Sequence, residues 1–201
     1  HVSILPRNDQ KQVDAVIKAL ELNPRQVYSV QTQGKIETLI PSKLSVQELF
    51  SQYLDLNGPP DRSLLRAFHH ICDKEGAAII DELLLPANED KLKEFINEYN
   101  IGEFICEFVK YGKPELDVLM SSCPQIKPRL YSIASSPSKA RGELELVIAN
   151  VLFGKGRHGL CTHFLTATNP KKLAMHTQRG VFLYPTDPKT PIVMTCLDDW
   201  R

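Results

Sequence analysis

Pro128-Arg129-Leu130-Tyr131-Ser132-Ile133-Ala134-Ser135-Ser136 is the stretch of this 201-residue chain that decides its fold. It places an arginine, an aromatic ring and a hydroxyl close together in a segment whose composition favours a β-strand. In an extended strand, residues i and i+2 point to one face, so Arg129 and Tyr131 share a face. A local turn then brings Ser132 beside them. The pattern predicts contact with a large ligand that is both anionic and aromatic.

A second short motif, Gly159-Leu160-Cys161-Thr162, follows downstream. Gly159 permits close approach of another backbone, and the residues from Thr162 to Leu165 have the apolar spacing of a helix. The two motifs, in this order and separated by a strand, resemble the flavin-binding signatures of the ferredoxin-NADP reductase superfamily. Those signatures are Arg-x-Tyr-Ser and Gly-x-(Ala/Ser/Cys)-(Ser/Thr). The second begins a helix against the flavin's pyrophosphate in that family, and free helix amides bind anions.

Within the superfamily the chain is most similar to the diflavin reductases, which include cytochrome P-450 reductase, the sulfite reductase flavoprotein and the reductase half of nitric-oxide synthase. The resemblance implies FAD as cofactor, with Tyr131 stacked on the isoalloxazine and Arg129 paired with the pyrophosphate. Ser132 then lies near flavin N5 as the catalytic residue that assists hydride arrival. The residues assigned to FAD by resemblance are Arg129, Leu130, Tyr131, Ser132, Val147, Ile148, Ala149, Phe153, Gly159, Leu160, Cys161 and Thr162.

Each assignment has a plainer alternative. Tyr131 could be an ordinary core or strand tyrosine, and Arg129 could form a surface salt bridge. The Ser132 hydroxyl could satisfy nearby backbone groups, as many serines do. Cys161 could be a reactive thiol if a helix N-terminus lowered its pKa.

The segment between the motifs, residues 143–153, is expected to be a strand. Its first half alternates acidic residues and leucines, and its later half is apolar on both faces, so we expect both faces to be covered there. By resemblance, Val147, Ile148 and Ala149 follow the edge of the flavin ring. Phe153 stands where relatives often have a tyrosine at the adenine or ribose end. Phenylalanine can stack there but cannot donate a hydrogen bond.

Composition narrows the class of protein. With 42% hydrophobic residues and zero formal net charge, the chain can bury a core in one large or two modest domains, and its pI near 7.2 argues against nucleic acid as a partner. No apolar run reaches the roughly 18 to 20 residues needed to cross a bilayer. The five cysteines lack a C-x-x-C pair, which favours reduced thiols over disulfides and argues against zinc. We expect a cytoplasmic location, or the cytosolic face of the endoplasmic reticulum if an upstream anchor exists.

The N-terminal residues His1 to Asp9 predict a strand that ends at Pro6, and they resemble the Gly-Asp-His-Val-x-x-x-Pro-x-Asn segment of the family. That match implies earlier barrel strands upstream, so we expect the chain to be a fragment. Apolar periodicity then predicts a helix from Lys11 to Pro24, followed by short strands at residues 27–30 and 35–40.

A long helical region follows. Ser45 and Glu48 form a capping-box pattern, and Leu44 and Leu49 occupy the hydrophobic-staple positions. Further helices are predicted from apolar stripes at residues 46–54, 64–72, 92–99, 101–108 and 115–122.

This helical insert matches the connecting domain of diflavin reductases. That domain has the motif Tyr-x-Asp-(Ile/Leu)-x-x-Pro-Pro. This chain has a similar stretch, Tyr53-Leu54-Asp55-Leu56-Asn57-Gly58-Pro59-Pro60. Relatives of the P-450 reductase type have an arginine in the preceding helix, where this chain has Gln47. The Gln47 side chain cannot replace that charge. We therefore expect either that other residues contact the flavin phosphates or that the affinity for the flavin is lower.

The C-terminal residues predict a closing strand at 181–185 and, at 190–194, the first strand of a nicotinamide domain. The turn that follows, residues 195–201, has no glycine and two acids, so it cannot bind pyrophosphate as in relatives. Diflavin reductases have an aromatic residue that covers the flavin. We interpret the similarity of Trp200 to that residue as a coincidence.

The six histidines do not suggest a metal site. His69 and His70 are adjacent on a helix and point in different directions, which is poor metal geometry. His158 and His163 flank the second motif and are interpreted as surface residues.

We therefore expect an α+β fold: an antiparallel flavin-binding β-barrel, incomplete at its N-terminus, with a helical insertion. Residues 1–41 and 125–190 form the barrel, 42–124 the helical connecting domain and 191–201 a truncated start of an NADPH-binding domain.

The expected function is the FAD-binding region of an NADPH-dependent diflavin oxidoreductase, which relays electrons from NADPH through FAD to FMN and a haem or other acceptor. The NADPH and FMN sites lie outside this chain, so the fragment alone is expected to be inactive. Its expected partners are an FMN-binding domain or flavodoxin-like acceptor and a haemoprotein. One alternative is a truncated, catalytically silent flavin-binding or protein-interaction module, and another is a helical scaffold that binds no flavin.

Overall fold

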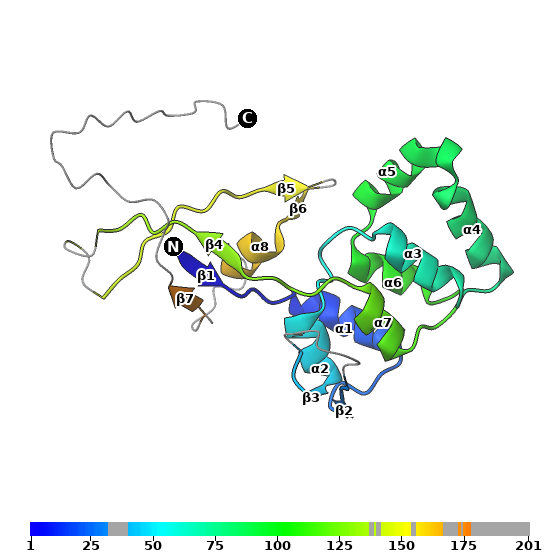
Figure 1. Ribbon diagram of the computed structural model, residues 1–201, viewed down its shortest axis with the longest axis horizontal. Coiled ribbons are helices and arrows are strands. Elements are labelled where there is room, and N and C mark those ends of the chain that lie inside the picture. Colours follow the sequence, from blue (N-terminus) through cyan, green and yellow to red (C-terminus); the bar gives the residue numbers. More distant parts are fainter. Residues whose placement is uncertain are drawn as a thin grey trace.

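The molecule consists of a helical part and a sheet part that lie side by side (Figure 1). The computed structural model describes residues 1–31, 40–136, 139, 142–153, 156–166, 173 and 175–177. The chain starts in the sheet part, crosses into the helical part before residue 10 and returns after residue 122 (Figure 1). The result is an α+β fold in which helices and strands are segregated.

The described elements of the helical part lie between residues 10 and 122. Its elements are α1 (Gln10–Ala19), β2 (Val27–Ser29), β3 (Lys43–Ser45), α2 (Val46–Glu48), the π-helix η1 (Leu49–Tyr53), α3 (Arg62–His69), α4 (Lys74–Leu84), the 3₁₀-helix η2 (Pro86–Asn88), α5 (Glu89–Glu98), α6 (Ile101–Phe108) and α7 (Leu116–Ser122). The antiparallel pair of β2 and β3 sits beside α2.

Side-chain caps begin several of these helices. The Ser45–Glu48 capping box predicted from the sequence is present at α2, and Asn100 and Glu103 form a second one at α6. Asp61 and Asp73 cap α3 and α4 through their carboxylates. These caps satisfy amide groups that a helix leaves unpaired at its N-terminus.

The core of the helical part is continuous and rich in aromatic residues. Phe104 is fully buried and packs edge-on against Phe68, with ring centroids 4.7 Å apart. Phe108 lies 4.5 Å from Phe104 on its other side, and Phe95 completes the group. Burial of several such rings contributes a large share of the stabilising free energy of a small domain.

Asn8 joins the start of the chain to this core. Its side chain donates to the carbonyls of Phe50 and Leu54, both at 2.6 Å, and accepts from the amide of Leu56 at 3.3 Å. Asn8 is itself buried. It therefore supplies partners for backbone groups around η1 that lie outside a regular helix ladder.

The sheet part is smaller. β1 (Val2–Ile4) lies between β4 (Arg129–Tyr131) and β7 (Met175–Thr177), and both pairings are antiparallel. β5 (Leu152–Phe153) pairs with β6 (Arg157–His158), and α8 (Leu160–Thr166) follows directly. Val2, Ile4 and Cys161 form its buried centre. Among the residues described, the sheets are short and do not close, so the expected barrel is not confirmed.

The structure corrects several predictions. The expected strand at residues 143–153 is a strand only at Leu152–Phe153, with one isolated bridge between Ile133 and Leu146. Its later half is not covered on both faces, because Val147 is 84% exposed and no element in the described part packs over it. Helix α4 and strands β3, β6 and β7 were not predicted. Their apolar signals are short or interrupted by polar residues.

Other expectations lie outside the described residues. These are the strands at 35–40 (apart from Ile40), 181–185 and 190–194, and the residues Cys196 and Trp200. Within the described ranges, none of the helices is long and apolar enough to cross a membrane. The described cysteines, Cys72, Cys106, Cys123 and Cys161, are free.

Candidate functional site

The two sequence motifs line one cavity. This cavity has a volume of about 480 Å³ and lies where the β5–β6 hairpin of the sheet part meets the helical part. Its size falls within the range of roughly 300–1,000 Å³ that is common for small-molecule and cofactor sites. Its lining residues are Asp55, Asn57, Gly58, Pro59, Ile96, Asn97, Tyr99, Arg129, Tyr131, Val151, Phe153, Arg157, Gly159, Leu160, Cys161 and Thr162.

Strand β4 carries Arg129 and Tyr131 to the cavity. Its register with β1 places Arg129 opposite Ile4 and Tyr131 opposite Val2, so the two side chains share a face as predicted. Leu130 lies on the other face and is 60% exposed. The Arg129 guanidinium donates to the carbonyl of Lys127 at 3.3 Å, and no carboxylate in the described part of the chain pairs with it. The surface salt bridge considered for Arg129 is therefore absent among those residues.

Tyr131 packs against the buried centre of the sheet part, which includes Cys161 of α8. Burial raises the pKa of Tyr131, and burial also raises the pKa of the Cys161 thiol. The direction for Cys161 is opposite to that of an activated thiol, so its interpretation as a reactive cysteine loses support.

The Gly159 motif (residues 159–162) forms the inner wall. The Gly159 amide donates to the carbonyl of Val151 at 3.1 Å, and its own carbonyl accepts from the amide of His163 at 2.8 Å. Thr162 is buried, and its hydroxyl donates to the carbonyl of Ala149 at 3.5 Å. The motif therefore turns the chain from β6 into α8, and α8 is the helix that the sequence predicted after Gly159.

Several predicted site residues lie outside the cavity lining. These are Leu130, Ser132, Val147, Ile148 and Ala149. The Ser132 hydroxyl is exposed and lies 3.4 Å from Nδ1 of His1. Val147 points into solvent for most of its surface. The structure brings Arg129, Tyr131, Phe153 and the Gly159 motif together, and it leaves the other five at the margin.

The helical part contributes a wall that sequence analysis missed. Asp55 accepts hydrogen bonds from the amides of Asn57 at 2.9 Å and Gly58 at 3.1 Å, and this turn presents residues 57–59 to the cavity. The Tyr53-x-Asp55 motif indicated this turn in the sequence, but it did not indicate that the turn lies beside the cavity. Three further residues of this wall lie at the end of α5: Ile96, Asn97 and Tyr99. No local sequence pattern predicted their place in the site, because it depends on tertiary contact.

The histidines beside the Gly159 motif line a shallower depression instead. His158 is exposed, as expected, whereas His163 is half-buried and its Nε2 lies 3.9 Å from a carboxylate oxygen of Asp9. His69 is 3.0 Å from the Asp81 carboxylate. No group of three metal-binding side chains occurs in the ranges that the structure describes.

A larger hollow of about 700 Å³ lies elsewhere, between β2, β3 and α7. The charged residues among its described lining are Glu115 and Asp117, both acidic. Such a lining repels an anionic ligand. The smaller cavity is therefore the better candidate for a ligand with phosphates.

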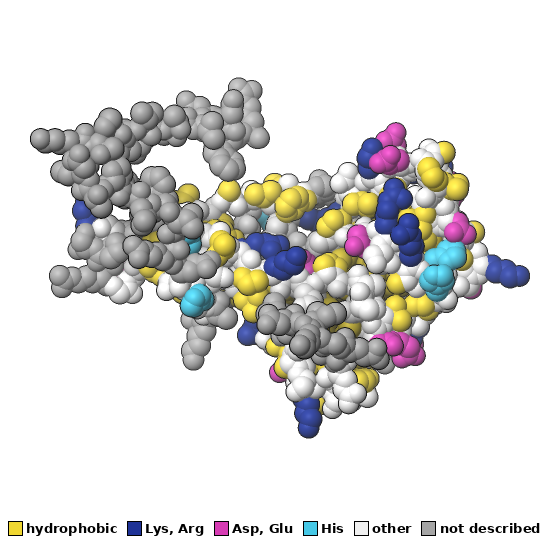
Figure 2. All heavy atoms as spheres, in the orientation of Figure 1, with side chains coloured by type: hydrophobic (Ala, Val, Ile, Leu, Met, Phe, Trp, Pro, Cys, Tyr) yellow, Lys and Arg dark blue, Asp and Glu magenta, His cyan; other side chains and the backbone are white. Residues whose placement is uncertain are grey.

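The smaller cavity fits a flavin dinucleotide in its chemistry. Tyr131 and Phe153 offer ring faces, and Arg129 offers a guanidinium whose charge is not offset by a carboxylate in the described part. Hydrophobic side chains also gather on the surface around β5 (Figure 2), where Val151, Leu152 and Phe153 are about half exposed. An apolar slot with a cation at one side suits a ligand with an aromatic ring and a phosphate tail.

Comparison with known families agrees with this geometry. The family described as "FAD binding domain" matches residues 1–164, which include both motifs and the whole helical part. The chain belongs to this family, and FAD is therefore its cofactor.

The similar proteins are named as an oxidoreductase, a synthase and a P450 reductase. The chain is 30% identical to the mouse (Mus musculus) protein named NADPH-dependent diflavin oxidoreductase 1, covering 96% of this chain and 35% of that protein. It is 26% identical to nitric oxide synthase of Bombyx mori, over 96% of this chain and 18% of that protein. It is 25% identical to the bifunctional cytochrome P450/NADPH–P450 reductase 2 of Bacillus subtilis, over 96% and 19%. The chain thus spans about a third or less of each relative.

Proposed function

We propose that this chain is the FAD-binding region of an NADPH-dependent diflavin oxidoreductase. In that role the whole protein relays electrons from NADPH through FAD to FMN, and then to a haem or another acceptor. The similar proteins carry NADPH, diflavin, nitric oxide synthase or P450 in their names, and the chain matches them over 96% of its length. An FMN-binding domain or flavodoxin-like protein and a haemoprotein are the partners that this proposal implies.

One observation carries the proposal: Arg129, Tyr131 and the Gly159 motif line a single cavity although they are far apart in sequence. A chance match to two short motifs would not require the two segments to meet. A helical scaffold without a flavin would not require a cavity between them either.

Each residue then has a physical task. The Tyr131 ring packs against the centre formed by Val2, Ile4 and Cys161 and lines the cavity, where it presents a face for stacking. The Arg129 guanidinium offers a planar, positively charged fork to the pyrophosphate. The exposed Ser132 hydroxyl is proposed to face flavin N5 and to orient the incoming hydride donor. The bound flavin supplies the redox chemistry, and the protein orients it.

The remaining expectations are part of the same proposal. Residues 147–149 lie along the flavin edge and Phe153 at the adenosine end, with Leu130 and Leu160 supporting the motifs. Residues 1–41 and 125–190 contribute to a flavin-binding barrel around the insert at 42–124, and 191–201 start an NADPH-binding domain. The proposed location is the cytoplasm or the cytosolic face of the endoplasmic reticulum.

Titration of the purified chain with FAD, followed by flavin fluorescence and visible absorption, tests the proposal. Tyr131→Ala removes a stacking face and is expected to weaken binding by about 10-fold or more, since one aromatic–base stack contributes roughly 1–3 kcal/mol. Arg129→Ala is expected to have a similar effect through lost charge-assisted hydrogen bonds, with only partial recovery in Arg129→Lys. Tyr28→Ala and Arg25→Ala are matched controls in the helical part.

If Tyr131→Ala and Arg129→Ala bind FAD as tightly as the unaltered chain, the site assignment is wrong. The silent-module alternative requires a different measurement. NADPH-driven reduction of bound FAD in the full-length protein supports the oxidoreductase, and FAD binding without reduction there favours the alternative.

A further inference from the structure

We propose that Arg157 is a positioning residue, which holds the Gly159 motif against the cofactor's phosphates by tying it to the helical part. This inference rests on the proposed function, because it assigns a purpose to the motif's position. It goes further in giving the helical insert a direct part in cofactor binding.

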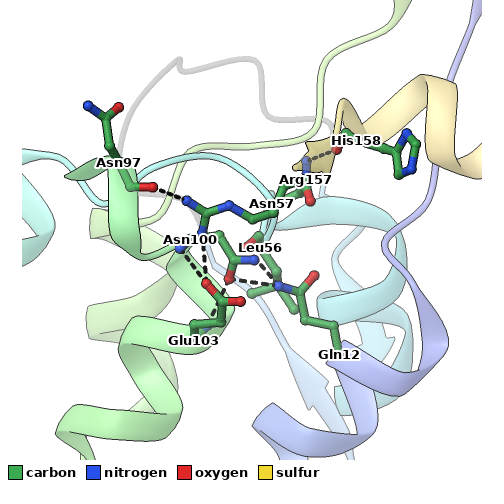
Figure 3. A network of polar contacts seen from close by, with 8 residues as sticks. All are labelled: Gln12, Leu56, Asn57, Asn97, Asn100, Glu103, Arg157 and His158. Carbon is green, nitrogen blue, oxygen red and sulfur yellow. Dashed lines mark hydrogen bonds and ion pairs between the residues drawn. The ribbon is translucent and has the colours of Figure 1, made fainter. Parts of the chain in front are cut away.

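The side chain of Arg157 bonds to two residues of the helical part (Figure 3). Its Nη1 donates to a carboxylate oxygen of Glu103 in α6 at 2.7 Å, and its Nη2 donates to the carbonyl of Asn97 in α5. The Arg157 side chain is only 20% exposed, which strengthens the pair relative to one in open water. One guanidinium thus joins β6 to two helices.

The Glu103 carboxylate that pairs with Arg157 is itself held by a hydrogen bond within the helical part. Glu103 closes the capping box of α6: its carboxylate accepts from the amide of Asn100 at 2.9 Å, and its own amide donates to Asn100 Oδ1 at 2.8 Å. Gln12 in α1 donates to the same Asn100 oxygen at 2.8 Å and to the carbonyl of Leu56 at 3.2 Å (Figure 3). The carboxylate that receives Arg157 is therefore held by Asn100, and Gln12 holds Asn100 in turn and ties it to the segment at Leu56.

A second contact holds the next residue. The side-chain amide of Asn57 donates to the carbonyl of His158 at 3.2 Å. Both residues that precede Gly159 are thus attached to the helical part, and β5 pairs with them on the other side. Because Gly159 follows directly, these attachments set where residues 159–162 stand relative to Arg129.

The charge environment of Arg157 distinguishes two possible roles for this residue: positioning the Gly159 motif and binding the phosphates directly. Arg157 lines the same cavity as Arg129, so it could in principle face the phosphates. However, its guanidinium is paired with Glu103, whereas Arg129 has no carboxylate partner in the described residues. The two roles predict opposite effects of neutralising Glu103. Removal of a competing carboxylate would tighten phosphate binding by Arg157, while removal of its anchor would loosen the motif.

The first experiment needs no cofactor. Hydrogen exchange of the FAD-free chain is measured for unaltered protein, Arg157→Gln and Glu107→Gln. Glu107 lies one turn beyond Glu103 and pairs with Lys110, so its change controls for loss of an ion pair on α6. We expect peptides that cover residues 157–166 to exchange several-fold faster in Arg157→Gln and to be unchanged in Glu107→Gln. Equal exchange in all three proteins would overturn the proposal.

The second experiment measures FAD affinity and the ³¹P resonances of bound FAD. Glu103→Gln retains a side chain that can complete the capping box. We expect Arg157→Gln and Glu103→Gln each to weaken FAD binding by about 5- to 10-fold, with shifted pyrophosphate resonances, as for the loss of a partly buried charged pair. Arg157→Lys recovers little, because an ammonium cannot reach both partners as a fork does.

The outcomes separate the two hypotheses. Tighter FAD binding in Glu103→Gln would show direct phosphate contact and refute the positioning role. Failure of the unaltered chain to bind FAD would refute the proposed function, while the cofactor-free exchange data would still report whether Arg157 fixes the motif.

Discussion

The helical part and the sheet part differ in how they are held together. The helical part has one continuous core with fully buried aromatic rings, and side-chain caps begin four of its helices, α2, α3, α4 and α6. The sheet part has a centre of Val2, Ile4 and Cys161, and it leaves Val147 and Phe153 exposed. The stability of the first is internal. The second depends on contacts with its neighbour and, as we propose, with the cofactor.

The largest expected effect lies in the core of the helical part. Phe104→Ala removes a fully buried ring from the aromatic group and is expected to lower the free energy of unfolding by about 3–5 kcal/mol. Val147→Ala, at an exposed position of the sheet part, should change it by less than about 0.5 kcal/mol. Urea unfolding of the FAD-free chain measures both. Similar losses in the two variants would remove the contrast between the parts.

The next effect tests the junction between the parts. Asn8→Ala leaves the carbonyls of Phe50 and Leu54 and the amide of Leu56 without their side-chain partner. We expect a loss of about 2–3 kcal/mol, the cost of leaving buried polar groups unpaired. Gln10→Ala removes an exposed hydrogen bond to Asp14 and is the control. Urea unfolding with an unchanged midpoint for Asn8→Ala would contradict the role of Asn8 as the link.

We expect FAD binding to stabilise mainly the sheet part. The two parts should therefore respond differently to the cofactor. A ligand that binds only the folded state at 100 times its Kd adds about 2.7 kcal/mol of stability. With saturating FAD, we expect slower hydrogen exchange at residues 129–132 and 157–166 and little change at α3 and α4. Tyr131→Ala should abolish the slowing. Protection concentrated in α3 and α4 instead would place the ligand elsewhere.

The smallest effect concerns a cap far from the cavity. Ser45→Ala removes the capping box at α2 and is expected to cost about 1 kcal/mol without changing FAD affinity. Hydrogen bonds from Ser45 lower the pKa of Glu48. Its carboxylate therefore stabilises the fold above the pKa of the unfolded chain, and this is lost as pH falls through the lower folded pKa. Thermal unfolding at several pH values should show a weaker acid dependence in Ser45→Ala than in the unaltered chain.

Local signals explain which features could be predicted. The Ser45–Glu48 cap and the helices α1, α5, α6 and α7 follow from apolar spacing and capping residues within a few positions of each other. The Arg129 and Gly159 motifs were also recognised, because their residue types and order are specific. Helix α4 was missed although Asp73 caps it, since its apolar stripe is short and mixed with charged residues.

The long strand at residues 143–153 shows the opposite failure. Its alternation and later apolar run are typical of a strand, yet the described structure has regular pairing only at Leu152–Phe153. A strand needs a partner as well as a pattern, and the partner is set by tertiary arrangement. The exposed Val147 lies where we propose that the flavin edge runs.

The sequence by itself determined the family, the chemistry of the Arg129 and Gly159 motifs, and the helical character of the insert, because each depends on residues close together in the chain. Only the tertiary structure decided that Asp55, Asn97 and Arg157 share the cavity with those motifs. The contacts of Arg157 with Asn97 and Glu103 join residues more than fifty positions apart. No local pattern encodes such a pairing, since it forms only when the two parts are packed together.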